Sequence, residues 1–271
     1  MLVAAAVVPG APALVPELVG SAAADTEEAR SAAARAVGSV LDRLTGPGGV
    51  PIGRLVVLAA APAGAEAGSR SYDIGGELAD DSFGPQLRLP ALPGARPPLP
   101  VSGVEDGAAD DEGGESLVPT PLLVARWLCS QVAVDQPGAE ELWAEALWLT
   151  VTPEAAGDYG RTLDHDLAPV GLLVVADGAA PHGPADPAAE APRVAAYDEG
   201  LAKALESGDP GAVAALDVEL GLELAAEGAG LWPALASASR GAAWRAGLLW
   251  SGSPYGVAWF VAQWQRDVSR A

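Results

Sequence analysis

The chain has 271 residues, half of them apolar, which is enough for one large domain or two small ones with a sizeable core. Its 36 acidic residues outweigh 15 basic ones, and a net charge of −21 repels phosphate backbones and anionic membranes, so neither nucleic-acid nor membrane binding is expected. A single cysteine, Cys129, excludes an internal disulfide and any thiolate metal cluster, and it is interpreted as a buried, inert thiol on a helix face.

The first predicted elements are a strand, a helix and a second strand. The apolar run Leu2–Val8 predicts a buried strand, closed by turn residues at 9–12. A helix is expected from Ser21 or Asp25 to Leu44, because apolar residues recur there at helical spacing. Residues 54–61 predict another buried strand. Two strands joined through a helix in this way are expected to be parallel.

The N-terminal apolar run also bears on location. It carries no basic segment and is too short to cross a bilayer. With neither an export signal nor a transmembrane span in the sequence, the protein is predicted to be cytoplasmic.

The stretch from residue 62 to residue 119 is predicted to have little regular structure. Residues 105–115 are acidic and rich in glycine, with no large apolar side chain. Such a segment cannot offset its ordering entropy by burial, so it is predicted to be mobile and dispensable for folding.

Helices and strands alternate through the rest of the chain. The predicted helices are 121–132, 139–146, 159–167, 195–206, 212–227 and 231–239, with a polar loop at 186–192. The predicted strands are Leu147–Val151, the apolar run that starts at Gly171, and a C-terminal pair at 246–250 and 256–261. This order predicts an α/β fold, in a single domain over residues 1–271, with a mostly parallel central sheet flanked by helices.

The strand that starts at Gly171 points to a site. It ends at Asp177 and Gly178, and the following loop carries His182, one of only two histidines. Ligand sites of open α/β sheets lie beyond the carboxyl ends of their strands. We therefore expect His182 and Asp177 to be the catalytic candidates in a cleft, although Asp177 could equally cap the next turn. The other histidine, His165, lies between two acids and is interpreted as a solvated helix residue.

Motifs of the common nucleotide and hydrolase sites are absent. The sequence has no phosphate-binding loop of the Gly-x-x-x-x-Gly-Lys type, no Gly-x-Gly-x-x-Gly after a strand and no Gly-x-Ser-x-Gly. Eight tryptophans are present, and core packing explains most of them better than an aromatic ligand cage does.

Four pieces of the sequence are similar to one known family. Residues 8–17 (Val-Pro-Gly-Ala-Pro-Ala-Leu-Val-Pro-Glu) are similar to a family start that reads Pro-His-Pro-Pro before Leu-Val-Pro-Glu. The strand at 55–60 lies where the family carries a second histidine, and 175–182 (Val-Ala-Asp-Gly-Ala-Ala-Pro-His) is similar to its Ser-Gly-Asp-Leu-Ser-His. The ending at 248–262 is the most specific piece. The chain thus resembles the class III extradiol ring-cleavage dioxygenases of the subunit-B (LigB-like) superfamily, and most of all a branch from high-GC bacteria.

The resemblance implies a metal site that this sequence has lost. The family holds Fe(II) with two histidines and a carboxylate. Here Gly10 stands at the first ligand position, and 59–64 holds no histidine at the second. Glu227 lies near the carboxylate region but in no clear motif, and only His182 matches, at the position of the family's catalytic base. No metal or other cofactor is therefore expected. The cleft-lining candidates are Pro9, Gly10, Pro12, Glu17, Gly178 and Tyr255.

Three functions follow, in order of preference. The first is a LigB-like protein that has lost its iron and serves as a binding or partner module, for a small molecule or a protein. The second is a metal-independent enzyme that uses His182 as acid or base, with Asp177 or Glu17 nearby. The third is a divergent metal-dependent dioxygenase with a new arrangement of His165, His182 and acids. Homo-oligomer formation is left open. All three place Gly10 and residues 62–64 together at the carboxyl edge of the sheet, close to His182.

Overall fold

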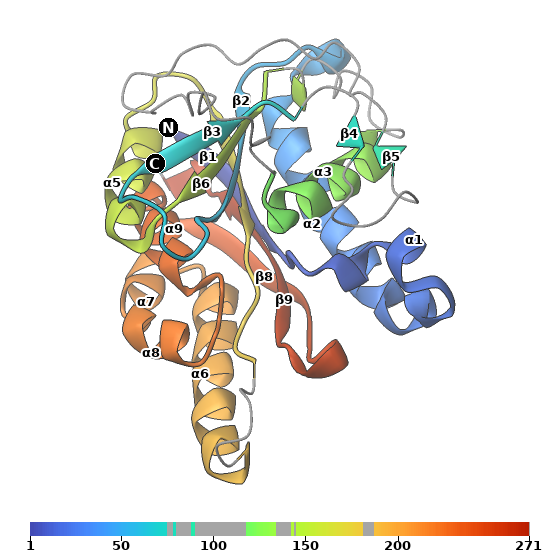
Figure 1. The fold of residues 1–271 in the computed structure, drawn as a ribbon. Helices are drawn as coiled ribbons and strands as arrows, with labels where there is room; N and C mark the ends of the chain where they lie inside the picture. The colour runs from blue at the N-terminus through green and yellow to red at the C-terminus, as the bar shows by residue number, and fades with distance from the viewer. Residues whose placement is uncertain are drawn as a thin grey trace.

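The computed structural model describes residues 1–74, 78–79, 88–89, 118–133, 142–143, 145–180 and 187–270. Within them the chain forms an α/β fold with a seven-stranded mixed sheet between two layers of helices (Figure 1). The segment 105–115 and the loop that carries His182 lie outside the described residues.

The sheet has the strand order β3-β6-β2-β7-β1-β9-β8. Its strands are β1 (Leu2–Val8), β2 (Arg54–Ala60), β3 (Ser69–Tyr72), β6 (Leu147–Val151), β7 (Val170–Val175), β8 (Trp244–Gly252) and β9 (Trp259–Arg266). The four central strands β6, β2, β7 and β1 are parallel, as predicted for a mostly parallel sheet. The strands β3 and β9 run antiparallel to their neighbours β6 and β1. A separate short pair consists of β4 (Leu78–Ala79) and β5 (Arg88–Leu89).

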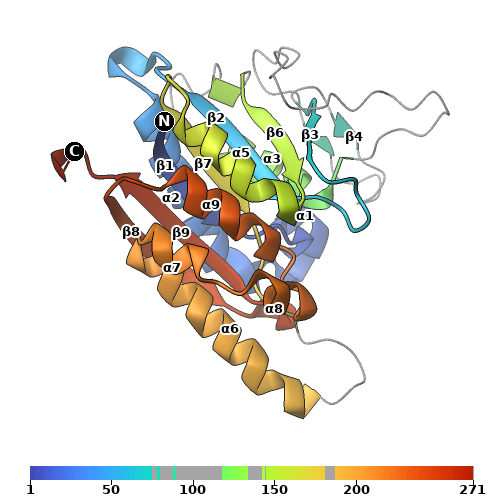
Figure 2. The same ribbon diagram turned by 90° about the vertical axis from the view of Figure 1, so that its left-hand side faces the viewer.

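Helices cover both faces of the sheet. The α-helices are α1 (Pro16–Val19), α2 (Glu27–Leu44), α3 (Thr120–Ala133), α5 (Pro153–Asp164), α6 (Pro187–Ser207), α7 (Pro210–Ala214), α8 (Val218–Glu223) and α9 (Trp232–Ala238). The 3-10 turns are Pro12–Leu14, Gly20–Thr26, Pro47–Gly49, Ala229–Leu231, Pro254–Gly256 and Val268–Arg270. Figures 1 and 2 show α2 and α3 on one side of the sheet and α5, α6 and α9 on the other.

Alternation along the strands separates the two cores. On β2, Leu55 and Val57 pack with α2 and α3, whereas Val56 and Leu58 pack with the helices of the opposite layer. On β9, Trp259 and Phe260 divide in the same way, as the alternation in the sequence predicted. Because both faces are covered, β7 is buried along its whole length. This explains why the central strands read as unbroken apolar runs.

The tryptophans pack mainly in these cores. Trp259 and Trp264 are each 1% exposed, and they lie beside Trp250 and Trp244 with ring centroids 6.5 and 6.0 Å apart. The buried indole nitrogen of Trp264 donates to the Leu205 carbonyl oxygen at 2.8 Å. These contacts agree with the packing role expected from the sequence.

Several predicted boundaries are wrong, and local capping explains them. The helix expected at 159–167 begins at Pro153, since proline suits a first helical turn and Glu154 suits its positive end. The helix expected at 212–227 is two helices, because the Asp217 carboxylate caps a new start by accepting from Leu220 N at 2.9 Å. The helix α2 begins at Glu27, after a 3-10 turn.

Two stretches predicted to be irregular contain some regular structure in their described parts. Of the polar loop expected at 186–192, residues 187–192 are the start of α6, and Pro192 lies inside this helix, beyond its first turn. The stretch 62–119 contains β3, a short polar edge strand without the apolar pattern that predicts strands. Of the helix expected at 139–146, Leu142 and Trp143 are helical, and most of the others lie outside the described residues.

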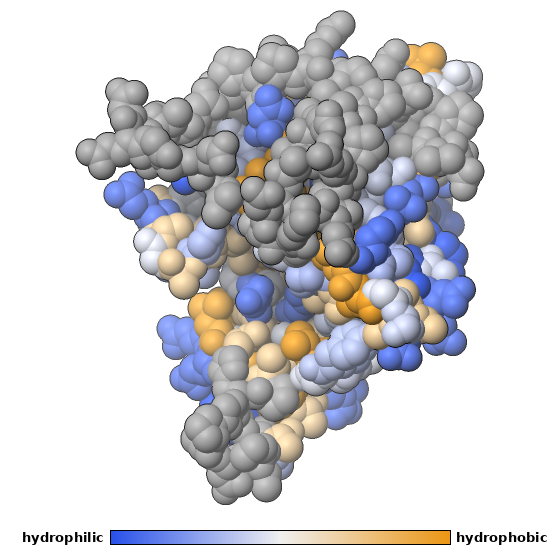
Figure 3. Space-filling model, turned by 45° about the vertical axis from the view of Figure 1, so that its right-hand side comes forward, coloured by the Kyte–Doolittle hydropathy of each residue, from blue (hydrophilic) through white to orange (hydrophobic). Residues whose placement is uncertain are grey.

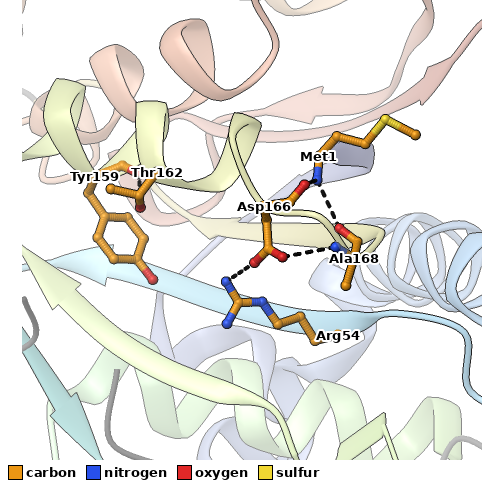
Figure 4. A network of polar contacts seen from close by, with 6 residues as sticks. All are labelled: Met1, Arg54, Tyr159, Thr162, Asp166 and Ala168. Carbon is orange, nitrogen blue, oxygen red and sulfur yellow. Dashed lines mark hydrogen bonds and ion pairs between the residues drawn. The ribbon is translucent and has the colours of Figure 1, made fainter. Parts of the chain in front are cut away.

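A polar network fastens the edge of the sheet where β2 and β7 begin (Figure 4). The Met1 nitrogen donates to the carbonyl oxygens of Asp166 and Ala168, and the Asp166 carboxylate pairs with Arg54. The same carboxylate accepts from Ala168 N at 3.0 Å. Burial raises the pKa of the nearby Tyr159 phenol. This edge is thus a structural junction.

None of the described helices is long and apolar enough to cross a membrane.

Candidate functional site

A cavity of about 600 Å³ opens at the carboxyl ends of the four parallel strands. Segments after β1, β2, β6 and β7 line it, together with the start of α3 and the loop after α8. Its described lining consists of Gly10, Ala60, Ala61, Pro62, Ala63, Gly64, Ala65, Pro119, Thr120, Pro121, Thr152, Pro153, Glu154, Val175, Ala176, Asp177, Leu222, Glu227, Gly228 and Gly230. This is the edge at which open α/β sheets carry ligands. Figure 3 shows how hydrophilic and apolar side chains surround a hollow on one face of the molecule.

Asp177 is a buried acidic residue in the lining of this cavity. The residue follows β7 after Ala176 and is only 9% exposed. The Oδ1 atom accepts a hydrogen bond from Gly10 N at 3.3 Å. Burial, opposed by this hydrogen bond and reinforced by the charge of Glu227, raises the pKa of Asp177 from 3.8 to about 7. Near neutral pH the carboxyl group can therefore both donate and accept a proton.

Two further carboxylates line the same cavity. Glu227 lies in the loop after α8, and Glu154 lies in the first turn of α5, directly after β6. Both side chains are exposed. Hydrogen bonds from its own backbone and from the Thr152 hydroxyl lower the pKa of Glu154, which is consequently ionised at neutral pH. The cavity thus joins one buried and two solvated acids.

Small residues set the shape of the cavity walls. A Cβ atom added to Gly10 would lie 2.9 Å from Pro121 Cβ and 3.2 Å from Val175 Cγ1. A Cβ atom added to Gly228 would lie 2.3 Å from the Cβ of Ala176, beside Asp177. Because the proline ring of α3 cannot rotate away, position 10 has no room for a larger side chain. Gly228 in turn lets the Glu227 loop approach the end of β7.

The prediction that Gly10 lies close to residues 62–64 is confirmed. Gly10 and residues 62–64 line one cavity with Asp177, at the edge where β1, β2 and β7 end. Parallel strands end at one edge, so the sequence pattern was sufficient for this prediction. His182, expected close by, lies outside the described residues.

The other cleft-lining candidates have different surroundings and are not among the described lining residues. Pro9 is buried, and both Pro12 and Glu17 are exposed on the short turns after β1. Gly178 is buried beneath Phe260 and donates its N–H to the Ala258 carbonyl oxygen at 2.7 Å. Tyr255 is 55% exposed and its hydroxyl donates to the Ala22 carbonyl oxygen at 3.3 Å.

His165 is exposed and lies just after α5, next to the junction that contains Asp166. That junction is at the beginning of β7, whereas Asp177 follows its end. His165 and Asp177 therefore stand at opposite edges of the sheet. The described residues contain no group of three His, Cys, Asp or Glu side chains placed to hold a metal ion.

The site also contains residues that sequence reasoning missed. Thr152 and Glu154 directly follow the predicted strand Leu147–Val151, so the rule that selected Asp177 could have selected them too. Glu227 was noticed in the sequence but had no motif. It reaches the cavity from a loop between helices, a position that local pattern does not predict.

The fold and the cavity define an α/β protein with an acidic pocket at the carboxyl edge of a mixed sheet. A scan against protein-family models gave no match, and no curated protein matches the chain.

Proposed function

We propose that the chain is a LigB-like binding module that has lost its iron and takes a small molecule into the pocket around Asp177. One observation carries the proposal: the positions at which the resemblance has histidines, Gly10 and the segment at 59–64, border a pocket but offer no side-chain donor there. The pocket is of the size that small ligands occupy, roughly 300–1,000 Å³. The cytoplasmic location stays a prediction from the sequence, and homo-oligomer formation stays open.

The packing around Gly10 supports the proposal that the iron chemistry is lost. The pocket lacks a histidine at this position and also has no room for one. Iron needs an imidazole at this position if the family's arrangement is kept. Because Pro121 stands 2.9 Å from the place of a Cβ atom, a histidine here would require α3 to move. The pocket is therefore shaped around the glycine.

The proposal is tested on the purified full chain by elemental analysis and an oxygen-uptake assay with protocatechuate and Fe(II). We expect less than stoichiometric iron and no oxygen uptake. A screen of small molecules by thermal shift should then give ligands whose effect is lost in a variant that narrows the pocket at an exposed lining residue, Ala63→Leu. About one iron per chain, or oxygen uptake that His182→Ala abolishes, would overturn the proposal.

A metal-independent enzyme is the second candidate, and the pKa of about 7 at Asp177 favours it. A general acid or base works best when its pKa lies near the working pH. Once a ligand is known, mass spectrometry of its mixture with the protein decides between the two. Turnover by the unaltered protein, lost in both Asp177→Asn and His182→Ala, would show an enzyme, and an unchanged ligand would show a binding module.

A further inference from the structure

We propose that the pocket binds a small organic cation, with a primary ammonium group against Asp177 and Glu227 and a short apolar body against the wall formed by residues 60–65 and Leu222. This inference rests on the proposed binding function and names the class of ligand for the same pocket.

The charges of the pocket have one sign. Among the described residues that line it, every charged side chain is acidic: Glu154, Asp177 and Glu227. Carboxylates that converge on a cavity favour a cation inside it, and they repel carboxylate and phosphate ligands. The net charge of −21 adds a long-range attraction for cations.

The surroundings of Asp177 show how one of these acids can reach a ligand. It is more than nine-tenths buried, yet only its Oδ1 atom has a hydrogen-bond donor among the described residues, the Gly10 amide at 3.3 Å. No described residue donates to Oδ2. Among the described residues, Oδ2 is not one of the buried side-chain atoms that lack a partner, so it reaches the water of the pocket, where a charged donor can meet it. A ligand cation in the pocket would be that donor.

An ammonium group fits these surroundings better than a metal ion does. It offers three N–H donors, and one or two carboxylates with a hydroxyl can accept them. Thr120 and Thr152 place hydroxyl groups on the same lining. Hard metal cations such as Ca²⁺ instead take about six to eight oxygen ligands.

The rest of the lining fits an apolar body. Residues 60–65 contain four alanines, a proline and a glycine, and Pro119 and Pro121 face the same cavity. Leu222 is 47% exposed at this pocket although it is a large apolar residue. Apolar contact there would cover a side chain that water now surrounds.

The test compares three probes with the same apolar body and different head groups: hexylamine, hexanol and hexanoate. Each is titrated calorimetrically into the full chain at neutral pH. We expect hexylamine to bind about tenfold or more tightly than hexanol, and hexanoate to show no binding. Asp177→Asn should weaken hexylamine binding by about tenfold to a hundredfold and leave hexanol binding unchanged.

The control variant is Glu206→Gln, which removes one exposed carboxylate from α6 and leaves the pocket intact. If hexylamine loses the same affinity in Glu206→Gln and in Asp177→Asn, the attraction is that of the acidic surface and the inference fails. Displacement of hexylamine by millimolar Mg²⁺ or Ca²⁺ in stoichiometric competition would also overturn it, in favour of a metal site.

The outcomes separate this inference from the proposed function. If hexanol or hexanoate binds at the pocket and hexylamine does not, the ligand class is wrong and the binding function stands. If all three probes and the wider screen leave the protein unaffected, the binding function itself fails.

Discussion

The substitution Asp177→Asn should stabilise the protein at alkaline pH. The pKa of Asp177 is raised from 3.8 to about 7, chiefly by burial. Between these two values the native state holds a proton that the unfolded chain has released. The contribution of Asp177 to the free energy of unfolding is therefore fully present below about pH 4 and is lost as the pH rises through 7. Asparagine resembles the protonated acid and does not titrate, so it escapes this loss.

The magnitude follows from the gap between the two values. At about 1.36 kcal/mol per pH unit, this group lowers the free energy of unfolding of the unaltered protein by about 4 kcal/mol between acid and alkaline pH. The Gly10 hydrogen bond need not be lost, because the side-chain oxygen of asparagine also accepts. We expect Asp177→Asn to equal the unaltered protein at about pH 4 and to exceed it by about 2–4 kcal/mol at about pH 8.5.

Urea denaturation at several pH values measures this difference. Comparing the two proteins at each pH cancels the titration of the histidines and of the exposed acids. Glu206→Gln controls for the loss of one negative charge and should follow the unaltered protein throughout. A constant difference between Asp177→Asn and the unaltered protein from pH 4 to pH 8.5 would refute the argument, since it would show that Asp177 titrates alike in both states.

Three further predictions concern packing. Gly160→Ala should destabilise the protein by about 1–3 kcal/mol, because its Cβ atom would lie 2.3 Å from the Ala234 carbonyl oxygen of α9. Gly157→Ala, one turn earlier on α5 with its nearest atom at 3.8 Å, should be neutral or stabilising by up to about 1 kcal/mol in the same thermal or urea melts. Gly10→His should lower stability by about 1–3 kcal/mol and leave the protein without stoichiometric iron by elemental analysis; iron at one per chain would contradict this. Cys129, which is fully buried with its pKa raised by that burial, should react with a thiol reagent only when the chain unfolds, and rapid labelling of the native protein would show the core placement to be wrong.

The central strands could be predicted because a strand that is buried on both faces is a continuous apolar run in the sequence. The run at β7 is apolar throughout, and its abrupt end at Asp177 marked the edge at which a ligand site forms. The edge strand β3 has no such pattern, since most of its residues are polar and none is fully buried at the margin of the sheet. The contribution of Glu227 could not be predicted either, because it depends on the close approach of Gly228 to Ala176, which are far apart in the sequence.

Asp177 combines a penalty for stability with the geometry expected of a binding group. A carboxylate retained only for structure would be satisfied by the residues around it, and its replacement by asparagine would weaken the fold. Here the largely buried residue lines a cavity, burial and the charge of Glu227 raise its pKa, and the neutral amide should be the more stable choice. Active and binding sites often show this conflict between stability and function. A single variant that gains stability at alkaline pH and loses affinity for hexylamine would therefore identify Asp177 as a group kept for its ligand. Loss of both stability and affinity would instead assign it to the support of the loop after β7.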